Sequence, residues 1–208
     1  TLGTLAANNA PGADVVATST GNDVVRFVGT IADGTANGAT TAANLYALMP
    51  TITDFTVGTS AGATDFLAFS SSNSDFSASN ATPAAQVGLS KGNTVDGLGA
   101  ADAMVVQSVT QNAAAAALTT DVSFVKLATG VTFSGATTVA SAMQTAIGTA
   151  SITGLAADGA YLVSFYDTTN NKMVIADVNV GASAAADSTL SSADFTAGAG
   201  VHLVGVLN

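Results

Sequence analysis

The sequence predicts a β-dominated α+β fold. Hydrophobic residues make up 48% of the 208 residues and charged residues only 9%, a bias opposite to that of disordered chains. Runs rich in Val, Ile, Thr, Phe and Tyr recur between clusters of Gly, Asn, Asp and Ser, a pattern typical of short strands joined by turns. Only a few short runs have helical periodicity. Strands that alternate with short helices favour helices packed on a sheet.

The first third of the chain predicts short strands around one helix. Residues 1–38 are rich in Gly, Asn, Thr and Ala with isolated Val pairs, which indicates tight turns joined by very short strands. Residues 39–49 predict a helix that Pro50 ends. Strands are expected at 51–56 and 64–69.

The rest of the chain predicts a surface excursion followed by a more regular region. Residues 70–99 are rich in Ser, Asn and Gly and predict a long surface segment. Helices are expected at 112–118, which is Ala-rich, and at 137–147, where apolar residues recur every four positions. Residues 167–171, DTTNN, predict a tight hairpin because Asn tolerates a left-handed backbone. The remaining strands are expected at 103–109, 121–127, 160–166, 172–180 and 201–207.

The charge of the chain is lopsided. All 14 acidic residues are Asp, and four basic residues leave a formal net charge of −10. This balance argues against nucleic acid, whose phosphates the chain would repel. Asp suits both turns and oxygen-ligated cation sites, so composition alone leaves open whether a turn-rich chain simply avoids Glu. No run approaches the ~18 apolar residues of a membrane span, so we expect no membrane insertion.

The residue inventory predicts a protein that is not an enzyme. The chain has no Cys and a single His, His202, within the apolar run 201–207, where a His is usually a strand side chain. No Gly-x-Ser-x-Gly motif is present to expose a nucleophilic Ser. Two carboxylate pairs, Asp96 with Asp102 and Asp187 with Asp194, are interpreted as turn or helix caps, with calcium ligation as the alternative.

One short repeat is the sequence feature that indicates cation binding. Gly12-Ala-Asp14-Val-Val recurs nine residues later as Gly21-Asn-Asp23-Val-Val. The repeat resembles the nonapeptide GGxGxDxUx of the RTX proteins, a bacterial family exported by type I secretion. The resemblance implies a parallel β-roll in which stacked turns share calcium. Two ordinary turns that happen to contain Gly-x-Asp are the alternative.

The repeat also departs from the family pattern. The family's leading glycines are replaced by Asn9 and Ala10 in the first unit and by Thr18 and Ser19 in the second. Two units are fewer than a solenoid normally needs. We therefore expect short calcium-binding, β-roll-like N-terminal rungs packed on a β-sheet domain with a few short helices.

Two further segments resemble parts of the same secreted proteins. The stretch ITDFTVG at 52–58, followed by TDFLAF at 64–69, is similar to the segment that caps RTX repeats, which makes Asp54 and Asp65 ligand or capping candidates. The C-terminal region from 161 to 208 is similar in pattern to the tail domains of type I secreted S-layer and surface proteins. The implied metal residues are Gly12, Asp14, Gly21, Asp23, Asp54 and Asp65, and the implied cofactor is calcium.

These observations define three segments and one leading hypothesis. Residues 1–69 are expected to form the degenerate roll and its cap, 70–99 the surface excursion, and 100–208 a C-terminal β-rich α+β domain, with one continuous domain as the alternative. We expect a secreted, extracellular structural protein that binds copies of itself, and cell-surface polysaccharide as a further partner, in an S-layer or filament. Few charges and strand edges without Lys favour such self-assembly. The alternatives are an export or targeting module of a larger RTX protein, a calcium-dependent adhesin, and a viral coat protein.

Overall fold

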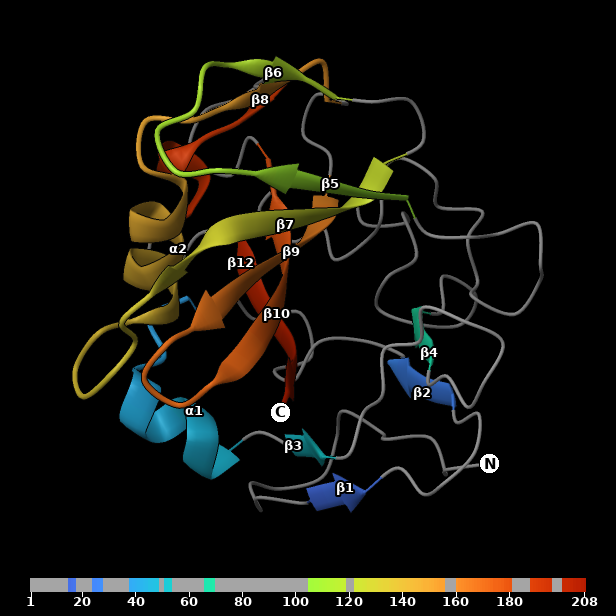
Figure 1. Cartoon of the computed structure of the whole chain (residues 1–208), viewed down its shortest axis with the longest axis vertical. Helices are drawn as coiled ribbons and strands as arrows, with labels where there is room; N and C mark the ends of the chain where they lie inside the picture. The colour runs from blue at the N-terminus through green and yellow to red at the C-terminus, as the bar shows by residue number, and fades with distance from the viewer. Residues whose placement is uncertain are drawn as a thin grey trace.

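A computed structural model describes residues 15–17, 24–27, 38–48, 51–53, 66–69, 105–118, 122–155, 160–180, 188–195 and 200–208. They form a strand-dominated fold with short helices (Figure 1). The β-dominated α+β fold class is therefore confirmed. The calcium-binding roll stays a prediction.

The main sheet has seven strands in the order β1-β3-β12-β10-β9-β7-β5. Only β10 runs antiparallel to its neighbours, because the β9–β10 hairpin reverses the chain; the pairs β5–β7, β7–β9, β12–β3 and β1–β3 are parallel. The strands are β1 (Val15–Ala17), β3 (Thr51–Thr53), β12 (Val201–Leu207), β10 (Lys172–Asn179), β9 (Ala160–Asp167), β7 (Val122–Val131) and β5 (Val105–Val109). Strands from both 1–69 and 100–208 thus share one sheet.

Two smaller sheets complete the strand pairing. The first has the order β11-β8-β6, from β11 (Thr189–Leu190), β8 (Ile152–Thr153) and β6 (Ala116–Ala117). Each of its strands belongs to a different connection of the main sheet, so this small sheet ties three connections together. The second pairs β2 (Val24–Phe27) with β4 (Phe66–Phe69) in parallel.

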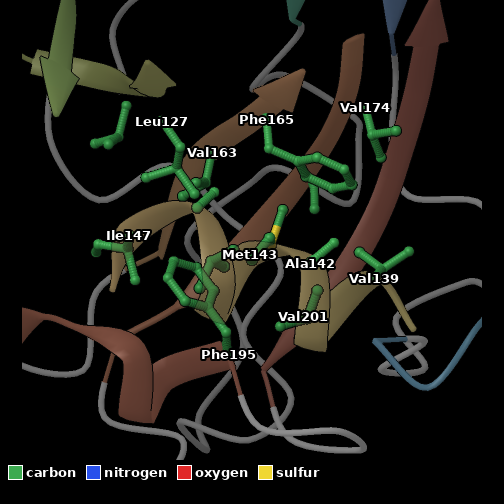
Figure 2. Close-up of a cluster of buried hydrophobic side chains, with 14 of the residues drawn as sticks. Leu127, Val139, Ala142, Met143, Ile147, Val163, Phe165, Val174, Phe195 and Val201 are labelled. Carbon is green, nitrogen blue, oxygen red and sulfur yellow. The ribbon is translucent and has the colours of Figure 1, made fainter. Parts of the chain in front are cut away.

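The core lies between the main sheet and helix α2 (Val139–Ile147), which packs on β7, β9 and the short 3-10 helix η2 (Ser192–Phe195). Thr138 caps α2, since its hydroxyl accepts from the backbone N–H of Ser141 at 3.2 Å. Figure 2 shows Met143 and Ala142 of α2 among Val163 and Phe165 of β9, with Phe195 of η2 nearby. Most side chains of this cluster are fully buried.

Most predicted elements in the described residues are confirmed. Helix α1 (Ala42–Leu48) lies within 39–49, and α2 lies within 137–147. The strands expected at 103–109, 121–127, 160–166, 172–180 and 201–207 are present with small shifts of their ends. The 167–171 hairpin is confirmed, and Asn171 has the expected positive φ of 53°. The surface excursion at 70–99 lies outside the described residues.

The helix expected at 112–118 was wrong. Residues 111–112 form a turn in which Asn112 has a φ of 58°, and Ala116–Ala117 form β6. The backbone N–H of Ala116 donates to the carbonyl of Ser151 at 3.0 Å, and that of Leu118 to Thr153 at 2.8 Å. Pairing with β8 therefore replaces the hydrogen bonds that a helix would have made, and tertiary context overrides the helix propensity of Ala.

Candidate functional site

All six predicted metal residues, Gly12, Asp14, Gly21, Asp23, Asp54 and Asp65, lie outside the described residues. The structure does describe the four short strands beside them. β1 and β3 pair in parallel, and so do β2 and β4, each in full register over the described strand. The first and third strands of the chain therefore share one sheet, and the second and fourth share another.

Within the described residues, the acidic side chains lie in the C-terminal part of the fold and have structural surroundings. These residues include three aspartates, Asp167, Asp177 and Asp194, and all are fully buried. A buried carboxylate is tolerated only when hydrogen bonds or a charge partner replace its hydration. The surroundings of each carboxylate therefore show what it does.

Asp167, at the end of β9, is the centre of the best-developed polar network. Its Oδ2 accepts from the Tyr46 hydroxyl and from Asn170 Nδ2, both at 2.6 Å. Its Oδ1 accepts from the backbone N–H of Thr169 at 2.8 Å and of Phe133 at 3.2 Å. A carboxylate with four donors is fully used, so Asp167 holds three separate pieces of chain together.

The same network shifts two pKa values in opposite directions. Burial, and then the hydrogen bond and the negative charge of Asp167, raise the pKa of the Tyr46 hydroxyl far above its usual value of 10.0. Burial pushes the pKa of Asp167 upward, but the hydrogen bonds from Tyr46, Asn170, Thr169 and Phe133 outweigh it and hold the pKa below 3.8. The pair is therefore a neutral phenol that donates to a carboxylate.

Tyr46 has two further contacts. Its ring meets Phe133 edge-on with centroids 6.0 Å apart, and the Lys172 Nζ lies 5.4 Å from the Tyr46 ring centroid. Both geometries are favourable for aromatic rings. No sequence pattern indicated Tyr46, and Asp167 was predicted only as part of a turn. The position of Asp167 before TTNN was the one signal for a local acceptor.

Asp194 caps η2. Its Oδ2 accepts from the backbone N–H of Ser191 at 2.8 Å, while Ser191 Oγ accepts from the N–H of Ala193 at 3.3 Å. This reciprocal arrangement is a capping box. The capping interpretation of Asp194 is confirmed; Asp187 lies outside the described residues.

Asp177 belongs to a polar group on the sheet face opposite α2. It pairs in register with His202 on β12, and both side chains are fully buried. Each of the two has an interaction partner. Ser164 and Asn179 are buried on the same face, and their side-chain polar atoms have no hydrogen-bond partner among the described residues.

The described residues contain no group of three or more His, Cys, Asp or Glu side chains placed to hold a metal ion. Among the helices of the same residues, none is long and apolar enough to cross a membrane. No family model, curated protein or solved structure matches the chain.

Proposed function

We propose that the chain is a secreted structural protein that self-assembles into an extracellular S-layer or filament and needs calcium for full stability. The observation that carries this proposal is the alternation of β1 to β4 between two parallel pairs. A β-roll has this order, because successive strands alternate between two sheets. Together with the Gly-x-Asp repeat before β1 and β2, it favours the RTX-like interpretation over two unrelated turns.

The strand register supports a shared cation at Asp23 and Asp65. Asp23 immediately precedes Val24 in the sequence, Asp65 immediately precedes Phe66, and Val24 and Phe66 are register partners. Two carboxylates at equivalent positions before neighbouring parallel strands are suited to one calcium ion, which needs six to eight oxygens. We assign Asp23 and Asp65 to one site.

Asp14 and Asp54 are assigned to separate sites. Asp14 precedes β1 and Asp54 follows β3, and these two strands run parallel. The two residues therefore belong to opposite ends of the strand pair. Gly12 and Gly21 would allow their turns to direct backbone carbonyls toward the ion.

Self-assembly is supported by the surface of the C-terminal region. All three aspartates described there are buried, whereas Lys126 is exposed and Lys172 half-buried. The described residues of this region therefore carry no exposed aspartate, so the part of the surface that they form offers little like-charge repulsion between copies. The extracellular location follows the calcium proposal, since low cytoplasmic calcium would keep the chain unfolded for export and calcium outside would fold it.

Negative-stain electron microscopy of the purified chain, in calcium and after chelation, tests the proposal. We expect ordered sheets or fibres in calcium that disperse on chelation. The double variant D23N/D65N should fail to assemble in calcium, whereas D121N/D158N, which removes the same charge elsewhere, should assemble normally.

The other outcomes separate the alternatives. Assemblies that resist chelation would keep the structural role and remove calcium from it. Dispersed monomers under both conditions would contradict assembly and favour the export module. Equal loss of assembly in both double variants would show that total charge, and not the Asp23/Asp65 pair, controls association.

A further inference from the structure

Four polar side chains lie on the face of the main sheet that points away from α2. All four are fully buried, and they are Asp177 and Asn179 of β10, His202 of β12 and Ser164 of β9. Successive side chains of a strand point to opposite faces, and the intervening residues of β10, Ala176 and Val178, belong to the core on the α2 side. The polar side chains are therefore separated from that core by the sheet itself.

The strand register places three of these side chains next to one another. Asp177 and His202 are direct partners on neighbouring antiparallel strands, and such partners have Cβ atoms about 5 Å apart on one face. Asn179 is the next residue of β10 on that face. Ser164 pairs with Ile175 on the other side of β10, so β10 separates it from His202. We call Asp177, Asn179 and His202 the β10–β12 cluster.

The Asn179 amide needs an explanation. Neither its Oδ1 nor its Nδ2 has a hydrogen-bond partner among the described residues. The neighbouring strands offer it no polar side chain, because its backbone N–H donates to the Gly200 carbonyl at 2.7 Å on one side and Ala160 is its register partner on the other. A buried amide without a partner is costly, and in a folded protein it indicates a water molecule or an ion bound beside it.

We infer that the β10–β12 cluster binds a divalent transition-metal ion of the Zn²⁺ type. The cluster offers an imidazole nitrogen, a carboxylate and an amide oxygen. An imidazole donor favours Zn²⁺ and related ions, whereas Ca²⁺ takes oxygen ligands. Zn²⁺ lies about 2.0–2.2 Å from its nitrogen and oxygen ligands, so side chains that are neighbours on one sheet face can share one ion. A water molecule takes the fourth position of the tetrahedral site.

The surroundings of Asp177 and His202 are compatible with ligation. Each of the two has an interaction partner, and metal ligands in proteins commonly keep a second interaction that orients them. The Asp177 carboxylate also offsets part of the charge of a buried cation. None of the three residues belongs to the proposed calcium sites, so zinc binding here does not depend on the proposed function.

A Zn²⁺ titration of the untagged chain, followed by nitrogen NMR of the imidazole ring, tests the site. His202 is the only His of the chain, so its ring nitrogens give one set of signals. We expect one Zn²⁺ per chain in equilibrium dialysis and a shift of one ring nitrogen that is complete at one equivalent. Excess calcium is present throughout, so the response to Zn²⁺ is separate from any response of the proposed calcium sites.

Two variants separate ligation from burial. Asn179→Leu and Ser164→Ala each remove a fully buried polar side chain that has no hydrogen-bond partner among the described residues. Without zinc, both should therefore unfold at the same urea concentration as the wild type or at a higher one. Asn179→Leu should bind Zn²⁺ at least about tenfold more weakly, because loss of even an outer-shell partner costs about 10–100-fold in affinity. Ser164→Ala is the matched control and should bind as tightly as the wild type.

The opposite results would overturn the zinc site. His202 signals that do not move at saturating Zn²⁺, or the lack of one bound ion per chain, would mean that internal water alone accompanies Asn179. Equal zinc affinity of the wild type and Asn179→Leu would remove the amide from the site. An equal loss of affinity in Ser164→Ala would show that zinc responds to packing of this sheet face and not to the three assigned ligands.

Discussion

Tyr46 and Asp167 are 121 residues apart in the sequence, and their side chains share a hydrogen bond of 2.6 Å. The bond matters because both groups are out of water to a large degree. An Asp167 carboxylate that lost the phenol would remain buried with a lone pair unsatisfied, which costs about 1–3 kcal/mol. The Tyr46 phenol therefore stabilises the contact between α1 and the end of β9. It also fixes the geometry of that contact more specifically than apolar burial alone would.

Because the pKa of Tyr46 is raised in the folded chain, the stabilising effect of its hydrogen bond should decrease at alkaline pH. A group whose folded pKa lies above its unfolded value contributes stability fully below the unfolded pKa, here near 10.0, and loses it as pH rises further. We expect the free energy of unfolding to fall from pH 9.5 to 11 by about 1 kcal/mol more in the wild type than in Tyr46→Phe. Urea unfolding across that pH range measures the difference. Equal slopes in the two proteins would contradict it.

At the acid end the same pair behaves in the opposite way. The pKa of Asp167 is lowered in the folded chain, so its contribution is present above the unfolded value near 3.8 and disappears as pH falls through the folded pKa. The two limits together predict that this contact is fully formed across the whole neutral range. Any dependence of assembly on pH within the neutral range would therefore have to come from other titratable groups.

At the scale of elements, Asn112 connects the turn after β5 to the end of α2. Its backbone N–H donates to the Ile147 carbonyl at 3.1 Å, and its Oδ1 accepts from the backbone N–H of Thr149 at 2.9 Å. Asn112 has a φ of 58° and the C-cap Gly148 a φ of 59°. The left-handed backbone thus occurs on both sides of this contact, where Asn and Gly are the tolerated residues.

Substitution at Asn112 separates backbone strain from the side-chain bond. Asn112→Gly keeps the left-handed backbone and loses the acceptor, so we expect a loss of about 1 kcal/mol in unfolding free energy. Asn112→Ala adds the penalty of positive φ and should lose about 2 kcal/mol. Urea unfolding of both variants measures the order. An alanine variant as stable as the glycine variant would show that the turn relaxes.

Residues 112–118 show the limit of prediction from local sequence. The period of apolar residues predicted α2, and the Asn pair predicted the β9–β10 turn, because both signals are local. Five alanines follow Asn112, and their high helix propensity predicted a helix that the structure does not form. Pairing with β8 decides the matter through Ser151 and Thr153, about 35 residues later, a contact that local propensity does not contain.

The candidate sites divide in the same way. The capping role of Asp194 follows from SSAD, which is a local motif, whereas the Tyr46–Asp167 pair joins distant segments and has no local signature.

At the scale of the molecule, the high hydrophobic content and the low charge predicted that the chain folds. The joining of β1 and β3 to the C-terminal sheet was left open between one domain and two, because strand order depends on contacts of long range.

Calcium and unfolding should be linked over the whole molecule if the Asp23/Asp65 site exists. A ligand that binds only the folded chain adds about 2.7 kcal/mol to the unfolding free energy at a concentration of 100 times its dissociation constant. We expect a gain of that size in the wild type from urea unfolding with and without saturating calcium. The gain should be absent in D23N/D65N and retained in D121N/D158N. A gain of the same size in D23N/D65N would contradict the assigned site and show that calcium binds elsewhere in the chain.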